Sequence, residues 1–591
     1  MATEHPDNVT DAPGETPEET DESYVEIDGT ERRRAFVDRY PNAAQAVRVL
    51  FGVSFLSFAV GALFGLVQAL HRTGVLRVIA SADYYTILTA HGVLLALVFT
   101  TFGITGLFHW ANTRSLGVAP TSQRLTWLWI GTMTLGTLFA GSTIVAGLFP
   151  DIPASADVLF TFYAPLEAHP LFYVGAALLI VGSWIAGVDW FLQYREWRSA
   201  NPDSRIPLQS FMVMTTMLMW YLSTLGVAVE VVVFLIPWSL GLIGQVDPLL
   251  TRTLFWYFGH PVVYFWLLPA YMIWYTVLPK LAGGRLFSDP LARVVFVLFL
   301  ILSTPVGFHH QYTDPGVPAG FKFVAMTNTM FLLLPSLLTL FTVVASIEHG
   351  ARQRGGEGYL SWLRSLPWDR PAFTGIALSG IMFGAGGFSG MINAGMNINY
   401  LVHNTLWVPG HFHLTVGTAF ALTLMAVSYW LVPQITGKRL KLRGVAALQP
   451  YVWFLGMVLM SNAMHRAGLA GVPRRTAEPE YQQFSYDTVV GGIAEMQMQI
   501  ALGGTVLFVG AVMFLAVMLA TWTLSPPNAN LRVNGELPEP LSTATDSPKV
   551  LDNLKLWFAV AVVLVVLAYG IPLYSMVADG ILSPGSVPFP V

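Results

Sequence analysis

Residues 251–280 read TRTLFWYFGHPVVYFWLLPAYMIWYTVLPK, and the only Asp, Glu, Lys or Arg in this run are Arg252 and Lys280 near its ends. A helix rises 1.5 Å per residue, so the run is long enough to cross the roughly 30 Å of hydrocarbon in a bilayer. It is far too long for a transmembrane strand, which needs about ten residues. Because lipid offers the backbone no hydrogen-bond partner, only helices and closed barrels cross it. This stretch therefore predicts a membrane-spanning helix.

Twelve further apolar stretches of similar character flank this one. They cover residues 44–70, 84–110, 123–149, 169–194, 207–240, 288–308, 322–348, 372–396, 400–433, 447–470, 489–523 and 553–577. The composition agrees, because 54% of the 591 residues are hydrophobic and 11% are charged, whereas soluble proteins carry about 25% charged residues. We therefore expect an all-α integral membrane protein, a bundle of about thirteen transmembrane helices within residues 41–580.

Charge is distributed unevenly along the chain. Residues 1–31 hold eleven Asp and Glu and no Lys or Arg, which predicts an acidic disordered tail over residues 1–40; residues 581–591 form a short C-terminal tail. The positive-inside rule places the N-terminus inside, and an odd number of spans then places the C-terminus outside. In that orientation the outer side carries only seven of the 31 Lys and Arg, namely Arg72, Arg77, Arg252, Lys322, Arg466, Arg474 and Arg475.

The chain has only six lysines. Together with the acidic tail, this scarcity is typical of a salt-adapted organism, and high-GC codon usage explains the preference for arginine equally well. Nothing in the sequence indicates a nucleic-acid partner.

Cysteine is absent, which excludes disulfides, thiolate metal sites and covalent CxxCH haem attachment. Metal ligands must therefore be histidines or oxygen atoms. Histidines lie inside or at the ends of apolar stretches, where ionisable side chains are costly and become functional candidates. Under the orientation above, six of them converge in the outer half of the membrane: His91, His260, His309, His310, His411 and His413.

The spacing of these histidines indicates metal chemistry. His411 and His413 are two residues apart, about 200° around a helix, so one helix can serve two separate centres. His260 and the adjacent pair His309 and His310 supply three imidazoles, a donor set that suits copper, with zinc possible by ligand type. Tyr264 shares a helix face with His260. A lone membrane histidine is more often a helix–helix hydrogen-bonding group, but the convergence of six favours metal binding.

Three motifs carrying these residues resemble subunit I of the haem–copper oxygen reductases. They are WYFGHPVVY at 256–264, GFHHQ at 307–311 and VPGHFH at 408–413. The resemblance extends over residues 45–577. The two valines after His260-Pro261, and the WLLPAY that follows at 266–271, are similar to the B-family (ba-type) branch.

The resemblance implies two haems and one copper ion. It assigns the ligands as His91 and His413 for a low-spin haem of b type, His411 for a high-spin haem of a, o or b type, and His260, His309 and His310 for copper. Tyr264 would be covalently joined to His260 and would supply an electron and a proton for cleavage of the O–O bond. The haem propionates would contact Arg474, Arg475 and His403.

Proton supply would run along hydroxyl groups. Tyr264, Tyr271 and Tyr275 follow one face of their span, and Ser336 and Thr339 lie three residues apart on another. Packing is the ordinary interpretation of such residues, but B-family enzymes use this single path. In two places other members of the family carry carboxylates that this chain lacks: Val262 replaces a glutamate of other branches, and Asn399 stands where we expect an aspartate.

The resemblance implies the catalytic subunit of a respiratory terminal oxidase, which reduces dioxygen to water with proton uptake and proton pumping. The expected location is the plasma membrane of a prokaryote. Expected partners are a subunit II with a dinuclear copper centre, a small accessory membrane subunit, and a soluble cytochrome c or blue-copper electron donor. One alternative is a nitric oxide reductase of the same superfamily, which lacks the tyrosine at position 264. The other is a secondary transporter, which predicts internal repeats that the sequence does not show.

Overall fold

The computed structural model of the chain describes residues 36–74, 79–149, 151–477, 492–526 and 535–578. In these residues the regular structure is helical, and the only strand-like pairings are two isolated bridges, Ser288 with Ser542 and Thr405 with Pro473. The predicted tails, residues 1–40 and 581–591, lie outside the described residues except for residues 36–40. There Phe36 and Tyr40 are buried, and a short helix forms, α1 (Phe36–Arg39).

Twelve helices among the described residues are long and apolar enough to cross a membrane. They are Pro41–Arg72 (α2), Asp83–Leu116 (α3, η1 and α4), Gln123–Ala146 (α5), Pro170–Ala200 (α6), Leu208–Ser239 (α7, η2 and α8), Pro248–Leu281 (α9), Ala319–Gln353 (α11 and α12), Pro371–Ala394 (α13), Trp407–Thr436 (α15, η5 and α16), Arg443–Leu469 (α17), Ile493–Leu524 (α19) and Leu554–Ala578 (α20, η9 and α21). Each overlaps one of the predicted spans.

Several of these spans are divided into segments, either by a change of helix type or, between α11 and α12, by a turn at Leu332. Their segments are α3 (Ser81–Gly92), η1 (Val93–Phe99), α4 (Thr100–Leu116), α7 (Leu208–Val229), η2 (Glu230–Leu235), α8 (Ile236–Ser239), α11 (Ala319–Phe331), α12 (Leu333–Gln353), α15 (Trp407–Leu414), η5 (Thr415–Phe420), α16 (Ala421–Thr436), α20 (Leu554–Val565), η9 (Val566–Gly570) and α21 (Ile571–Ala578). The segments η1, η2, η5 and η9 are π-helical, and two of them, η1 and η5, directly follow candidate histidine ligands.

The one predicted span not among these twelve, residues 288–308, contains a shorter helix than expected. The helix α10 (Asp289–Ser303) has 15 residues, which is roughly 22 Å. It ends just before Pro305, which has no backbone N–H to donate to the carbonyl four residues earlier and so weakens the helix there. The chain then forms a 3-10 helix, η3 (Gly307–Gln311), so His309 and His310 lie on a separate turn instead of ending the span.

The prediction of one helix over residues 400–433 is wrong at its start. A short helix, α14 (Met396–Val402), comes first, and Asn404 then adopts a left-handed φ of 58°, a conformation that asparagine tolerates well. Thr405 pairs with Pro473 across this break. The long helix begins only at Trp407, so His411 stands in its first two turns.

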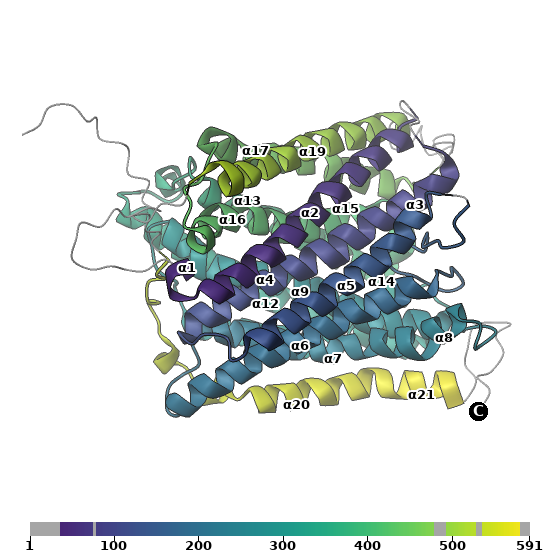
Figure 1. Ribbon diagram of the computed structural model, residues 1–591, viewed down its shortest axis with the longest axis horizontal. Helices are drawn as coiled ribbons and strands as arrows, with labels where there is room; N and C mark the ends of the chain where they lie inside the picture. Colours follow the sequence, from purple (N-terminus) through teal and green to yellow (C-terminus); the bar gives the residue numbers. More distant parts are fainter. Residues whose placement is uncertain (1–35, 75–78, 150, 478–491, 527–534, 579–591) are drawn as a thin grey trace, which may run out of the picture.

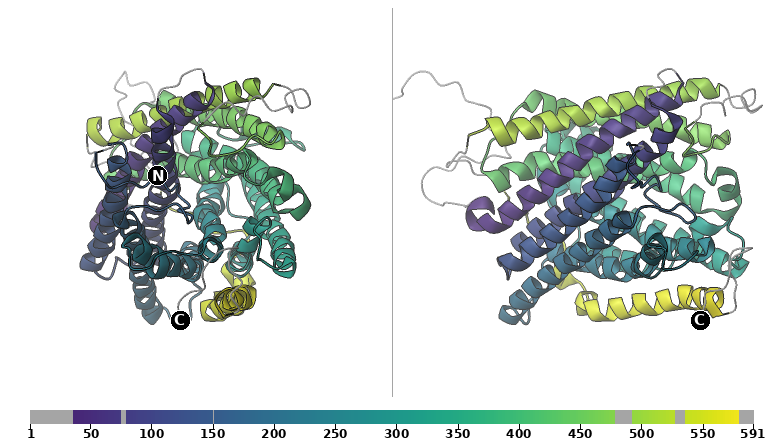
Figure 2. Two further views of the ribbon diagram at one scale, coloured as in Figure 1. Left: turned by 90° about the vertical axis from the view of Figure 1, so that its right-hand side faces the viewer. Right: turned by 45° about the vertical axis from the view of Figure 1, so that its right-hand side comes forward.

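The long helices lie side by side in one bundle, with α1 at one end and the end of α21 at the other (Figure 1). The two most buried spans are α9 and Trp407–Thr436, and they carry His260, Tyr264, His411 and His413. The last helix, α20 to α21, runs along the edge of the bundle, and both views in Figure 2 show it there. It is the least buried of the twelve spans.

The beginning of this last helix is anchored by buried charge. Arg293 on α10 is 1% exposed and binds Asp289 at 2.5 Å and Asp552 at 2.7 Å. Arg205 binds the same Asp552 at 2.6 Å. All three guanidinium nitrogens of Arg293 donate hydrogen bonds, to Asp289, Asp552 and the Ile206 carbonyl. The loop before α20 is therefore fastened to α10, the helix that leads into η3.

Candidate metal centre and its cavity

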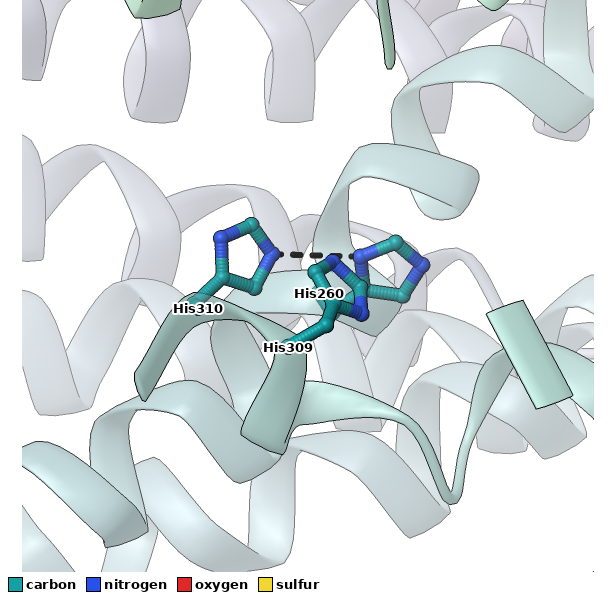
Figure 3. A group of neighbouring side chains, drawn as sticks. All are labelled: His260, His309 and His310. Carbon is teal, nitrogen blue, oxygen red and sulfur yellow. Dashed lines mark hydrogen bonds between the residues drawn. The ribbon is translucent and has the colours of Figure 1, made fainter. Parts of the chain in front are cut away.

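Three histidines from two elements come together inside the bundle (Figure 3). His260 on α9, and His309 and His310 on η3, each offer one ligand atom, and these atoms all lie within 4.8 Å of one another. His260 Nδ1 is 3.2 Å from His310 Nε2. The ring centroid of His309 lies 4.3 Å from that of His260 and 4.1 Å from that of His310. Three imidazoles at this spacing could hold a copper or a zinc ion.

Neighbouring side chains fix two of these rings. The Thr329 hydroxyl on α11 is 2.9 Å from His309 Nδ1, and the Trp256 ring stacks on His310 with centroids 3.7 Å apart. A histidine that binds a metal through one ring nitrogen is commonly held in orientation by a further contact to the rest of its ring. Neither contact was predicted from the sequence. The position of Trp256 one turn before His260 is the signal that could have indicated it, whereas Thr329 is brought near only by the tertiary fold.

One nitrogen of His260 has no hydrogen-bond partner. Its Nδ1 faces His310, and its buried Nε2 contacts no donor or acceptor among the described residues. The Tyr264 ring lies one turn further along α9, with its centroid 4.8 Å from that of His260. A buried polar atom without a partner is costly. The arrangement fits a histidine that binds a metal through Nδ1 and has the tyrosine beside it.

His91 and His413 face each other across the bundle. Their ring centroids are 6.4 Å apart and their planes differ by 19°. His91 Nδ1 lies 2.8 Å from the Gly61 carbonyl, and His413 Nδ1 lies 2.6 Å from the Pro409 carbonyl. With each Nδ1–H donated to a carbonyl, Nε2 remains available as a ligand. Metal–imidazole bonds are about 2.0–2.1 Å long, so the gap accommodates one metal ion bound from both sides.

His411 faces a different neighbour from His413. Its Nδ1 lies 2.9 Å from the Gly386 carbonyl and 3.1 Å from the Ser389 hydroxyl, both on α13. The two histidines therefore contact different helices, α13 for His411 and α3 for His413. The helix α15 thus directs the imidazole of His411 toward α13 and that of His413 toward His91 on α3.

Two glycines leave room for these rings. A Cβ atom at Gly390 on α13 would lie 2.6 Å from His411 Cε1, and one at Gly65 on α2 would lie 2.8 Å from His91 Cε1. Both distances are far below van der Waals contact. Any side chain at either position would push a candidate ligand out of place.

All six histidines line a single cavity of about 460 Å³ in the described part of the chain. The cavity is mostly apolar, as cofactor sites are. Five further predicted residues also line it, namely Tyr264, Ser336, His403, Arg474 and Arg475. Tyr271, Tyr275 and Thr339 lie outside the cavity lining.

Positive charge gathers at one end of this cavity. Arg474 donates to Asn404 Oδ1 at 2.8 Å, and the guanidinium of Arg475 lies 5.7 Å from the centre of the Tyr163 ring. Burial, together with the charges of Arg474 and Arg252, lowers the pKa of His403 to about 4. His403 is therefore neutral at neutral pH. Paired guanidiniums next to a neutral imidazole are suited to carboxylate groups.

Two residues at this end were not anticipated. Arg252 also lines the cavity and forms an ion pair with Asp314 at 2.9 Å. Tyr163 lies between Arg252 and Arg475, and burial raises its pKa to about 12 despite these positive charges. Arg252 is one of only two charged residues in the apolar stretch 251–280, and that isolation is a signal the sequence does offer.

Asn399 is buried near the same end of the cavity. Its Nδ2 donates to the Asn393 carbonyl at 2.6 Å, and its Oδ1 has no partner among the described residues. The position therefore holds a neutral amide turned toward the chain's own backbone.

Hydroxyl groups of α9 and α12 pair in succession. Tyr271 Oη donates to Ser336 at 3.3 Å, and Tyr275 Oη donates to Thr339 at 2.8 Å. Ser336 lines the cavity, so the row begins there and follows α9 toward its C-terminal end. Thr342 is fully buried three residues beyond Thr339, and its hydroxyl donates to the Leu338 carbonyl of its own helix.

The chain was compared with known proteins. The profile of the family described as "Cytochrome C and Quinol oxidase polypeptide I" matches residues 45–506 and thus ends before the last helix. "Cytochrome c oxidase subunit 1" of Thermus thermophilus is 41% identical over 548 residues, which is 90% of this chain and 94% of that one. "Cytochrome c oxidase polypeptide 1" of Halobacterium salinarum is 24% identical over 81% of this chain and 78% of its own length. A solved structure described as a haem–copper terminal oxidase dimer matches with a TM-score of 0.83 and 37% identity, covering 90% of this chain and 92% of that one.

Proposed function

The chain belongs to the cytochrome c and quinol oxidase polypeptide I family, and from this membership we propose how its residues carry out the reaction. It is the catalytic subunit I of a haem–copper terminal oxidase, an oxidoreductase that crosses the membrane many times. The secondary-transporter alternative is thereby wrong. The Val262-Val263 pair and the high identity to the Thermus protein favour the B-family.

The observation that carries the proposal is the convergence of six histidines on one cavity. We assign them by their contacts, as His91 and His413 to a low-spin haem of b type, His411 to a high-spin haem of a, o or b type, and His260, His309 and His310 to one copper ion. The residues fit these groups, since each of the three proposed haem ligands has its Nδ1 next to a backbone carbonyl and its Nε2 left for iron. When bound, the two haems and the copper supply electrons and a binding place for dioxygen, which is reduced to water.

The remaining residues of the site position groups and move protons. We propose that Tyr264 is joined to His260 Nε2 and delivers a proton and an electron to dioxygen bound in the cavity. Arg474, Arg475 and His403 bind the haem propionates, whose negative charge the surrounding guanidiniums would balance. Asn399 cannot carry a proton as an aspartate would, so proton release in this chain would not pass through a carboxylate at that position.

We propose that protons reach Tyr264 along the hydroxyl row Tyr275, Thr339, Tyr271 and Ser336. The support is the alternation of hydrogen-bonded pairs between α9 and α12 and the position of Ser336 on the cavity wall. Proton pumping is proposed in addition, from the family.

Partners and location follow from the chain's composition and family. Because it has no cysteine, it cannot hold a dinuclear copper centre of the thiolate type, so we propose that electrons arrive through a subunit II that does. A soluble cytochrome c or blue-copper protein would be the donor, a small accessory membrane subunit would complete the complex, and the location is the plasma membrane of a prokaryote. Residues 41–580 form the membrane domain, between the two short tails.

Gas turnover and cofactor content of the purified complex test the function. We expect dioxygen consumption with a reduced donor, a pyridine haemochrome spectrum with two haems per subunit I, and one copper ion per subunit I outside subunit II. A complex that reduces nitric oxide without consuming dioxygen would instead be a nitric oxide reductase. Tyr264 and Val262 argue against that outcome, because those enzymes lack this tyrosine and carry extra glutamates near their metal.

Thr339→Val is expected to slow dioxygen turnover at least about tenfold. Valine has nearly the same shape but offers no hydroxyl to Tyr275, so the row is interrupted at its buried middle. Steady-state oxygen consumption measures the effect, and the haem spectrum should not change. Thr327→Val is the matched control: Thr327 is exposed on α11 and its hydroxyl bonds only its own helix. Wild-type turnover in the Thr339 variant would exclude this path.

Gly390→Ala is expected to remove the high-spin haem while the low-spin haem stays. The new Cβ would lie 2.6 Å from His411 Cε1, so the imidazole must leave its position, whereas His413 faces away from α13. Haemochrome quantification together with carbon monoxide binding gives the measurement. In the control, Gly384→Ala on the same helix, the Cβ meets nothing within 4 Å, and alanine favours a helix by about 1 kcal/mol. Equal haem content in the two variants would contradict the assignment of His411.

A further inference from the structure

We infer that Tyr569, in the last helix, is a positioning residue for the copper-binding turn, because its hydroxyl holds Gly307, the first residue of η3. The inference rests on the proposed function, since η3 carries the proposed copper ligands His309 and His310. It extends the site to a helix that lies beyond the part of the chain matched by the family profile.

The contact is a buried hydrogen bond across 262 residues of sequence. The Gly307 N–H donates to Tyr569 Oη at 2.7 Å. Tyr569 is only 1% exposed. Its ring stacks on Phe308, with centroids 5.0 Å apart, and packs against Tyr257 at 4.7 Å. The tyrosine therefore contacts both the turn that carries the histidines and the helix that carries His260.

Gly307 is enclosed on two sides. A Cβ atom there would lie 2.1 Å from the Trp256 carbonyl oxygen and 2.3 Å from Tyr569 Oη. The backbone of the turn is thus held between α9 and the last helix with no space to shift. Trp256 in turn stacks on His310 at 3.7 Å. Movement of Gly307 would therefore be transmitted to the His310 ring through a continuous set of contacts.

The local structure of the last helix is adapted to this contact. Tyr569 lies in the π-helical segment η9 (Val566–Gly570), and an extra residue in a turn changes where the side chains point. The helix as a whole is little buried, as only 22% of its most apolar stretch is covered. Tyr569 is the largest of the few buried side chains of this peripheral segment, which also include Ala561, Val565, Pro572 and Met576. Its position is supported at the other end of the helix by the Arg293–Asp552 ion pair.

The proposed metal ligands and one support of their backbone come from different parts of the subunit. The proposed ligands lie within residues 45–506, which the family profile matches, whereas one support of their backbone comes from the last helix, which lies outside that match. Residues that hold metal ligands indirectly affect metal affinity, and their loss commonly costs about tenfold or more. We therefore expect Tyr569 to influence how firmly copper is held, with little effect on either haem.

The test is Tyr569→Phe in the purified complex. Phenylalanine keeps the ring stacked on Phe308 and removes only the acceptor of the Gly307 N–H. We expect hydrogen–deuterium exchange at residues 305–312 to become about tenfold faster, and copper to be lost about tenfold faster to a chelator that removes it slowly from the wild type. The haem spectrum should stay unchanged. Tyr574→Phe is the matched control, because Tyr574 lies on the same helix and is 68% exposed; it should alter neither rate.

The outcomes distinguish this inference from the function on which it rests. Unchanged exchange at Gly307 and unchanged copper loss in Tyr569→Phe would overturn the positioning role, and so would equal effects of Tyr569→Phe and Tyr574→Phe. If the wild-type complex contains two haems but no copper outside subunit II, the proposed copper site fails. The exchange rate at residues 305–312 would then still decide whether Tyr569 holds the turn.

Discussion

His413→Ala is expected to abolish dioxygen turnover and to remove one haem, the low-spin one, from the purified complex. The rings of His413 and His91 face each other with their centroids 6.4 Å apart. The Nδ1 of His413 is directed at the Pro409 carbonyl, which leaves Nε2 for the metal. A haem bound through both axial positions loses half of its protein ligation with this change. Haemochrome quantification should fall from two haems to one per subunit. His91→Ala should produce the same spectrum, because it removes the opposite ligand.

The neighbouring substitution His411→Ala should have the opposite selectivity. His411 contacts Gly386 and Ser389 on α13 instead of His91, so the low-spin haem signal should survive and carbon monoxide binding should disappear. His465→Ala is the control, since His465 bonds its own helix at Ser461 and does not line the cavity. If His411→Ala and His413→Ala lost the same haem, the assignment of one helix to two centres would be wrong.

Tyr264→Phe is expected to lower dioxygen turnover by about 10²–10⁴-fold, the usual contribution of a group that transfers a proton in the rate-limiting step. Its ring lies 4.8 Å from His260 and lines the cavity, and phenylalanine has no hydroxyl to give up a proton. Haem and copper contents should remain at wild-type levels, because none of the proposed ligands changes.

Mass spectrometry of the peptide that contains residues 260–264 provides a second readout. If Tyr264 is bonded to His260 Nε2, the wild-type peptide is lighter by the hydrogen atoms lost on bond formation, and the variant peptide has its unmodified mass. Tyr429→Phe is the control, because Tyr429 is a buried tyrosine that bonds Gln449 and does not line the cavity. Wild-type turnover in Tyr264→Phe would remove this residue from the mechanism.

Several features of the fold could be predicted from local sequence. The length of each apolar run and the scarcity of charge within it predict a spanning helix, since the backbone must satisfy itself in lipid. The i, i+4 spacing of His260 and Tyr264 likewise predicts that the rings meet, and their centroids are 4.8 Å apart. Helical geometry alone connects these residues, so no knowledge of the rest of the chain is required.

Element boundaries were harder to predict where the breaks depend on distant contacts. Residues 400–433 are apolar enough for one helix, but Asn404 takes a left-handed conformation, and the turn around it is fixed by the segment near Pro473 and Arg474. The helix α10 ends at Ser303, two residues before Pro305, a helix-weakening residue that the count of apolar residues did not take into account. His309 and His310 consequently lie on a turn, and this is what lets both face His260.

The sequence by itself determined that this is a helical membrane protein, that any metal ligands must be histidines or oxygen atoms, and which residues on one helix share a face. Each of these conclusions depends on composition or on spacing within a few residues. The tertiary structure alone decided which helices meet. The bond from Gly307 to Tyr569, the contact of Thr329 with His309, and the pairing of Arg252 with Asp314 join residues 20 to 262 positions apart. Their partners are chosen by how the helices pack around one cavity, and no local pattern in the sequence encodes that choice.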